Sequence, residues 1–328
     1  MFFHAYEFGR KISNVIIYRD DVEDAVRKLD ESGGDHIVAK SLSALRSKLN
    51  EINRSRALQG LALMTLAIPL SACGGGGSED TSALPAPAEV TGRAIDGYLV
   101  GSTVSLSSDP LTTVLTNTGA GEQGTFSGLF GTGSIIVTGG KDVSTGKSFT
   151  GELRAPEGSA VITPITTLVE AVVSAGEATG GVAITAADAA AQVAKGLGLK
   201  SSTDLLNTDF VATGSSAVAK AAAQVASVIA VVSAGGGDAA AAAVVAKIAS
   251  KISSAGAAGG KSKVLTDTTE LKAAMAEVKE ENAEVFDSVS DTIDLDDFVE
   301  QMAEVVQTVN TKIAAATSMK DIVATQNA

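Results

Sequence analysis

A short apolar segment, ending at the chain's single cysteine and followed by a run of glycines, divides this sequence into two unequal parts. Residues 57–72 are mostly apolar, and Cys73 is followed by four glycines at positions 74–77. Glycine is less favourable than alanine in a helix by about 1 kcal/mol per residue, so this run does not continue a packed helix. We therefore expect the large folded core downstream of the glycines.

The apolar segment has the layout of a secretory signal peptide: a short basic flank precedes it, and small residues end it. Its 57–72 range is shorter than the roughly 20 residues that cross a bilayer as a helix. Pro69 near its end also interrupts helical hydrogen bonding. We predict a signal peptide over residues 54–72 rather than a permanent transmembrane helix.

The tetrad formed by Leu70, Ser71, Ala72 and Cys73 resembles the lipobox of bacterial lipoproteins. In that motif an aliphatic residue and two small residues are recognised by the signal peptidase, and the cysteine accepts diacylglycerol. The resemblance implies cleavage before Cys73, further acylation of the new amino terminus, and, because Gly74 rather than Asp follows the cysteine, an outer-membrane location. The alternative is a core helix in which Cys73 is a small buried residue.

The segments on either side of the signal carry separate predictions. Residues 1–53 form a longer and more highly charged segment than usually precedes a signal peptide. Either the start codon is assigned too early and translation begins between about Val38 and Leu49, or the segment is a cytoplasmic leader that delays export. Residues 73–89 are predicted to be the lipidated cysteine and a flexible linker, since they are rich in Gly, Ser and Pro.

Charge and residue types after Cys73 exclude several classes of chemistry. The first 72 residues hold 10 of the 25 Lys and Arg and 9 of the 38 Asp and Glu, which leaves 15 basic and 29 acidic residues downstream. This balance disfavours nucleic-acid binding, which needs clustered basic side chains. Both histidines, His4 and His36, precede the predicted cut, so we expect no histidine-based catalytic or metal site and no cofactor.

Residues 90–163 are predicted to form a small antiparallel β-sandwich, because short β-type runs alternate there with glycine-rich turns. The predicted strands are Val90–Ile95, Tyr98–Leu106, Thr112–Leu115, Gly124–Leu129, Ser134–Val137, Ser148–Arg154 and Ala160–Ile162. The stretch from Gly92 to Leu106, with Gly124-Thr-Phe126 and residues 133–137, resembles the carboxypeptidase regulatory-like domain, a transthyretin-like sandwich. The resemblance implies an accessory module without peptidase activity, with a longer turn than usual over residues 116–124.

Residues 164–328 are predicted to form an Ala-rich helical bundle or hairpin domain, which makes the fold class α+β. Thr163 before Pro164 predicts one helix start, and Thr185 with Asp188 predicts another. A turn over residues 235–238 is expected to produce an αα-hairpin. The apolar stripes expected to face the core are Val225, Val228, Ile229 and Val232, then Val244, Ile248 and Ile252, then Leu271, Met275, Val278 and Val285, and last Phe298, Met302, Val305, Val309 and Ile313.

Two segments partly match ligand-binding loops. Residues 140–148 have five residues between the glycines instead of the four of a phosphate-binding loop and lie between strands, so they predict a hairpin turn. The acidic run over residues 287–300 lacks the spacing of a calcium loop. It predicts a helix start at which Asp294, Asp296 and Asp297 favour the helix dipole, with a loose calcium site as the alternative.

Together these features predict an outer-membrane lipoprotein with a non-enzymatic structural, adhesive or partner-binding role, whose partners are membrane lipid and a protein or surface. The alternatives are a small-ligand or glycan-binding lipoprotein and an envelope hydrolase. A pocket lined by Tyr98, Phe126 and Phe130 would favour ligand binding. A strongly perturbed titratable group in a cleft would favour an enzyme, and an exposed apolar stripe on a convex surface would favour assembly.

Overall fold

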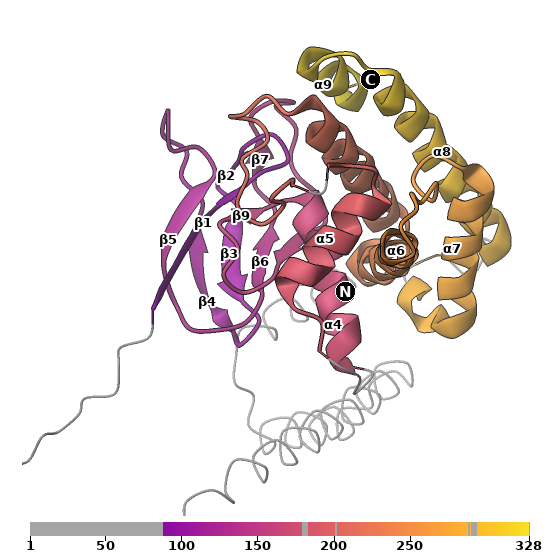
Figure 1. Cartoon of the computed structure of the whole chain (residues 1–328), viewed down its shortest axis with the longest axis horizontal. Coiled ribbons are helices and arrows are strands. Elements are labelled where there is room, and N and C mark those ends of the chain that lie inside the picture. The colour runs from indigo at the N-terminus through magenta and orange to yellow at the C-terminus, as the bar shows by residue number, and fades with distance from the viewer. Residues whose placement is uncertain (1–87, 179–182, 201, 288, 290–293, 328) are drawn as a thin grey trace, which may run out of the picture. The chain divides into compact units, whose positions relative to one another are not determined.

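The computed structural model describes residues 88–178, 183–200, 202–287, 289 and 294–327. In this part of the chain all the strands come before the helices (Figure 1). The strands are β1 Glu89–Ala94, β2 Leu99–Val100, β3 Thr103–Leu106, β4 Asp109–Leu115, β5 Thr125–Phe130, β6 Ile135–Thr138, β7 Lys141–Asp142, β8 Glu152–Ala155 and β9 Val161–Ile162. This order confirms the predicted α+β class.

The strands form three small sheets with the orders β5-β1-β9, β4-β3-β6-β8 and β2-β7. Pairing is antiparallel throughout the described strands, except that β9 runs parallel to β1, with Arg93 opposite Val161. A parallel neighbour needs a long connection, and here the chain passes through all the other strands between β1 and β9. This single pairing departs from the antiparallel arrangement expected from the sequence.

The predicted strand over residues 98–106 is interrupted by a bend at Gly101 and Ser102. Gly101 has a φ of 67°, which glycine adopts without strain. The Ser102 backbone N–H then donates to Thr116 Oγ1 (2.9 Å), and its hydroxyl donates to the Gly139 carbonyl (2.8 Å). The bend divides the run into β2 and β3, so that β2 pairs with β7 and β3 with β4 and β6.

The sandwich continues directly into helix α4, Pro164–Ala178. The Thr166 N–H donates to Thr163 Oγ1 (3.0 Å), and the Thr163 N–H donates to Thr166 Oγ1 (2.7 Å). This reciprocal pair satisfies backbone donors that a helix start otherwise leaves free, and it confirms the predicted start. Helix α4 packs on β8 and β9, so the sheets and the helices share one hydrophobic core.

Five more helices and one 3-10 turn follow in the described part of the chain. They are α5 Ala186–Gly196, α6 Ser216–Ala257, α7 Thr268–Glu281, the 3-10 turn η1 Ala283–Phe286, α8 Leu295–Ala315 and α9 Met319–Asn327. Thr185 caps α5 by accepting the Asp188 N–H (3.1 Å). The loop between α5 and α6 returns to the sheet, where the Leu206 carbonyl accepts the N–H groups of Ala160 and Val161.

Helix α6 is broken at Gly237, whose φ of 83° and ψ of 171° are not helical. The predicted change of direction is therefore confirmed, but one residue makes it instead of a four-residue turn. Val232 and Val244, from the two halves, line the same crevice. Among the described residues α6 is the one helix long and apolar enough to cross a membrane, yet its halves pack against α4, α5, α7 and α8.

Helices α7 and α8 pack antiparallel, with ion pairs from Lys272 to Glu300 and from Lys279 to Asp296 joining their surfaces. The predicted α8 stripe is wrong in part, because Val305 is 51% exposed. The buried positions of α8 are Val299, Ala303, Val306, Asn310 and Ile313. The buried face of α8 is therefore shifted by one residue along the sequence from the predicted face. Helix α6 packs against this buried face, which includes the small Ala303 and the polar Asn310.

Candidate functional site

The predicted lipidation site, Cys73, and the predicted peptidase-recognition residues Leu70, Ser71 and Ala72 lie outside the described residues. The described core begins downstream of them, with β1 at Glu89.

A pair of carboxyl groups lies where the turn between β1 and β2 meets the loop after β7. Asp96 Oδ1 is buried and has no hydrogen-bond partner. Burial raises the pKa of Asp96 from 3.8 to about 7, and repulsion by the Asp142 carboxylate adds to the rise. Asp142 is itself buried, and its oxygens accept the Ser144 backbone N–H (2.8 Å) and the Thr145 hydroxyl (2.7 Å).

Gly97 allows this close approach. A Cβ atom at position 97 would lie 1.8 Å from Asp142 Oδ1 and 2.3 Å from Ser144 Oγ, so only glycine fits without movement of the loop. The Val143 N–H donates to the Tyr98 carbonyl (3.0 Å) and fastens the same loop to the turn. The conformation of the Asp96-Gly97 dipeptide is therefore fixed by contacts with the loop after β7 as well as by the turn propensity of the two residues.

The loop after β7 is the segment that partly matches a phosphate-binding loop, and its structure confirms the predicted hairpin turn. The Asp142 N–H donates to the Lys147 carbonyl (3.0 Å), and Lys141 and Ser148 form a bridge across the turn. Strand β8 rather than a helix follows. The Asp142 oxygens are thus engaged in closing this turn.

A second polar cluster joins the sandwich to the loop before α6. The Arg93 guanidinium pairs with Asp209 (3.0 Å) and lies 5.0 Å from the centre of the Tyr98 ring. The Tyr98 hydroxyl donates to Asp209 (3.1 Å), and burial together with this carboxylate raises the Tyr98 pKa. Partly buried pairs of this kind fix the relative positions of the elements that carry them.

The aromatic residues proposed as a ligand pocket do not face a common cleft. Phe126 belongs to the core and is 3% exposed, whereas Phe130 is 59% exposed. Tyr98 is committed to the Asp209 cluster. The observation that was expected to favour ligand binding is therefore not met by these three residues.

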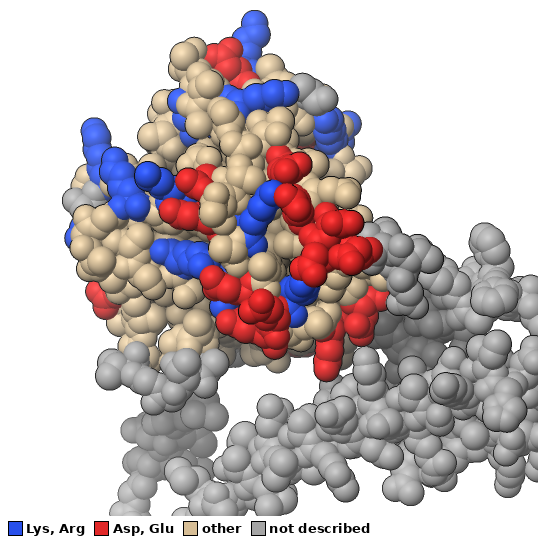
Figure 2. Space-filling view, turned by 90° about the vertical axis from the view of Figure 1, so that its right-hand side faces the viewer, with Lys and Arg blue, Asp and Glu red and all other residues tan. Residues whose placement is uncertain are grey.

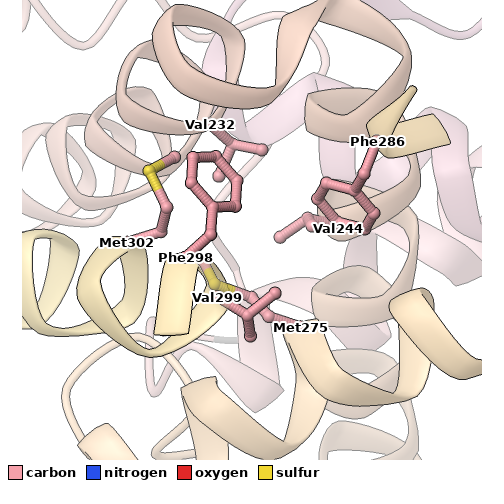
Figure 3. Close-up of a pocket in the computed structure, with 7 residues that line it drawn as sticks. All are labelled: Val232, Val244, Met275, Phe286, Phe298, Val299 and Met302. Carbon is pink, nitrogen blue, oxygen red and sulfur yellow. The ribbon is translucent and has the colours of Figure 1, made fainter. Parts of the chain in front are cut away.

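An apolar crevice lies between the halves of α6 and the helices α7 and α8 (Figure 3). Its lining residues are Val232, Val244, Met275, Phe286, Phe298, Val299 and Met302. The Phe286 and Phe298 rings meet edge to face with centroids 6.4 Å apart. The crevice has no room for a water molecule, so it is a packing seam of the helices.

Acidic side chains gather in groups on the face that Figure 2 shows, and basic side chains lie beside them. Lys247 and Lys251 of α6 pair with Glu277 of α7, and all three side chains are half-buried. The Asp294 side chain accepts the N–H groups of Asp296 and Asp297, which confirms the predicted helix start. In the described part of the chain, no three Asp, Glu, His or Cys side chains are grouped to hold a metal ion.

Sequence reasoning did not predict the exposure of three large apolar side chains: Leu111 and Leu115 of β4 and Phe130 of β5. These side chains are 79%, 67% and 59% exposed. Strand β4 has an irregular register against β3 between Asp109 and Val114, so the alternation of its side chains could not be read from the sequence.

Comparison of this chain with protein-family models, curated proteins and solved structures finds no match. The resemblances to lipoproteins and to the carboxypeptidase regulatory-like domain stay predictions from the sequence.

Proposed function

We propose that this protein is a bacterial lipoprotein anchored to the outer membrane through Cys73. Its folded part, carried on the linker after Cys73, has a non-enzymatic structural or partner-binding role at the cell envelope. The observation that carries the proposal is the position of the chain's one cysteine, which ends an apolar segment at Leu70-Ser71-Ala72-Cys73 and precedes a glycine run.

The arrangement of the fold supports this proposal. The structure describes residues from position 88 onward, and these residues form a hydrophobic core of their own. After cleavage, the segment between Cys73 and Glu89 would serve as a tether between the lipid anchor and the folded part. A cleaved and lipidated product can thus keep the whole described fold.

The raised pKa of Asp96 alone meets part of the expectation for an enzyme, but its neighbour Asp142 is engaged in a turn, so we favour a binding or structural role over catalysis. Asp142 closes a turn, and Asp209 joins two parts of the fold through Arg93 and Tyr98. The crevice between the helices is filled by its own side chains.

Metabolic labelling with an alkyne fatty acid tests the anchor. The unchanged chain is expected to take up label and to sediment with membranes, whereas Cys73→Ser is expected to lose both the label and the membrane attachment. Ser78→Ala, in the tether, is the matched control and should behave as the unchanged chain. Label that persists in Cys73→Ser would defeat the proposal.

A further inference from the structure

The carboxyl groups of Asp96 and Asp142 lie near each other without a positively charged partner. Gly97 lets the Asp142 side chain rest against the turn that carries Asp96, and the Asp142 charge acts on the Asp96 carboxyl group. Among the described residues, none of the ion pairs made by Lys and Arg includes either carboxylate. Because buried charges in proteins are normally paired or bound to a metal ion, this pair calls for a neutralising group.

A proton neutralises the pair only in part. It cancels the charge of Asp96, but Asp96 Oδ1 is buried without a hydrogen-bond partner among the described residues. Asp142 acts on Asp96 through its charge and not through a hydrogen bond, so the two groups do not share a proton. A cation placed between the carboxylates would bind the free oxygen and remove the repulsion at the same time.

Other oxygen atoms lie at the same place. Asp142 Oδ1 and Ser144 Oγ both lie over Gly97, where a Cβ atom would be 1.8 Å and 2.3 Å from them. Asp142 Oδ1 accepts the Ser144 N–H (2.8 Å), and a carboxylate with one such bond to each oxygen still has lone pairs for a metal ion. Ser144 is exposed, so water can reach this edge of the site.

We propose that Asp96 and Asp142 bind a calcium ion, with Ser144 Oγ and water completing its coordination. The ion would fasten the turn between β1 and β2 to the loop after β7. Calcium accepts carboxylate, other protein and water oxygens in a flexible geometry, whereas magnesium demands a nearly ideal octahedron. A site with only two carboxylates binds weakly, and we expect a dissociation constant on the order of 0.1–1 mM, as in extracellular modules. The inference goes beyond the proposed function and does not depend on lipidation of Cys73.

Thermal unfolding of the full chain, treated with EDTA and then dialysed, tests the site. Calcium at about 10 mM is expected to raise the melting temperature of the unchanged protein by about 4–8 °C, because an ion that binds only the folded state stabilises it by mass action. Sodium chloride of equal ionic strength should not reproduce this shift. Asp96→Asn should lose the calcium-dependent shift but be at least as stable as the unchanged protein in EDTA, which separates lost binding from failed folding.

Asp297→Asn is the matched control for calcium bound by the acidic helices. Asp297 is exposed at the start of α8, in the acidic run, and its replacement should leave the whole calcium-dependent shift in place. A melting temperature that ignores calcium would overturn the inference. An equal shift in Asp96→Asn, or a shift abolished by Asp297→Asn, would overturn it too.

Terbium, which binds the same oxygen ligands as calcium, gives a second and independent measurement. Tyr98 follows Gly97 directly and is the one tyrosine in the described part of the chain. Excitation of tyrosine is therefore expected to produce terbium emission that added calcium displaces. The emission should be lost in Asp96→Asn and kept in Asp297→Asn, and equal emission from both variants would contradict the site.

Discussion

Replacing Asp96 by asparagine is expected to stabilise the protein at neutral and alkaline pH but not in acid. Asparagine has nearly the shape of a protonated aspartic acid and carries no charge. The buried Oδ1 atom has no hydrogen-bond partner, and the Asp142 carboxylate repels a second negative charge. The variant therefore removes an unfavourable charge and keeps the packing.

The size of the effect follows from the pKa of Asp96, which is 3.8 in the absence of the fold and about 7 within it. A shift of one pKa unit corresponds to about 1.4 kcal/mol, so ionisation of Asp96 lowers the stability of the folded state by at most about 4 kcal/mol. Movement of the turn relieves part of this energy, and we expect a gain of about 2–4 kcal/mol in Asp96→Asn above pH 7.

The direction of the pH dependence of stability is set by which state, folded or unfolded, binds the proton. Between pH 4 and pH 7 the folded state holds a proton on Asp96 that the unfolded chain has released, so the stability of the unchanged protein falls as pH rises through this range. In Asp96→Asn this contribution is absent. The difference in stability between the two proteins should start near zero at pH 4 and reach its plateau above pH 7.

Urea denaturation followed by circular dichroism at pH 4.5, 6, 7 and 8.5 measures this difference, and subtraction of the two curves cancels the titration of all other groups. Glu280→Gln, an exposed carboxylate on α7, is the control and should give no pH-dependent gain. A gain that is constant over the whole range, or a variant less stable than the parent at pH 8.5, would refute the account of Asp96.

Two further substitutions test the packing. Gly97→Ala places a methyl group 1.8 Å from a carboxylate oxygen and is expected to lower stability by about 1–3 kcal/mol. Gly119→Ala, where a Cβ atom meets nothing within 4 Å, is the control and should be nearly neutral. Equal melting temperatures of the two variants would contradict this expectation. Asn310→Ala removes the donor to the Leu265 carbonyl (2.8 Å) and the acceptor for the Ser227 hydroxyl (2.6 Å), and it should cost about 1–3 kcal/mol in urea denaturation. Ser227→Ala should cost less, and the reverse order would contradict the network.

Local signals predicted the elements of this fold well. Thr163 before Pro164, and Thr185 with Asp188, fixed two helix starts because the capping hydrogen bonds form between residues three positions apart. The glycine run around Gly237 correctly placed the break in α6. Such signals can be read from the sequence because the capping or breaking residue lies within a few positions of the helix end that it determines.

Features that depend on distant residues could not be read from the sequence. The parallel pairing of β9 with β1 joins residues almost 70 positions apart, and the face that α8 buries is chosen by contacts with α6. The perturbed Asp96 looked like an ordinary turn residue in Asp96-Gly97, because the Asp142 carboxylate that faces it comes from another strand.

Mass spectrometry of the protein purified from both the membrane fraction and the cytosolic fraction of cells tests the central proposal most directly. The proposal predicts an amino-terminal peptide that begins at Cys73 and carries the added mass of diacylglycerol and an acyl chain. A peptide that runs unmodified through Ala72 and Cys73, from protein recovered in the cytosol, would contradict it.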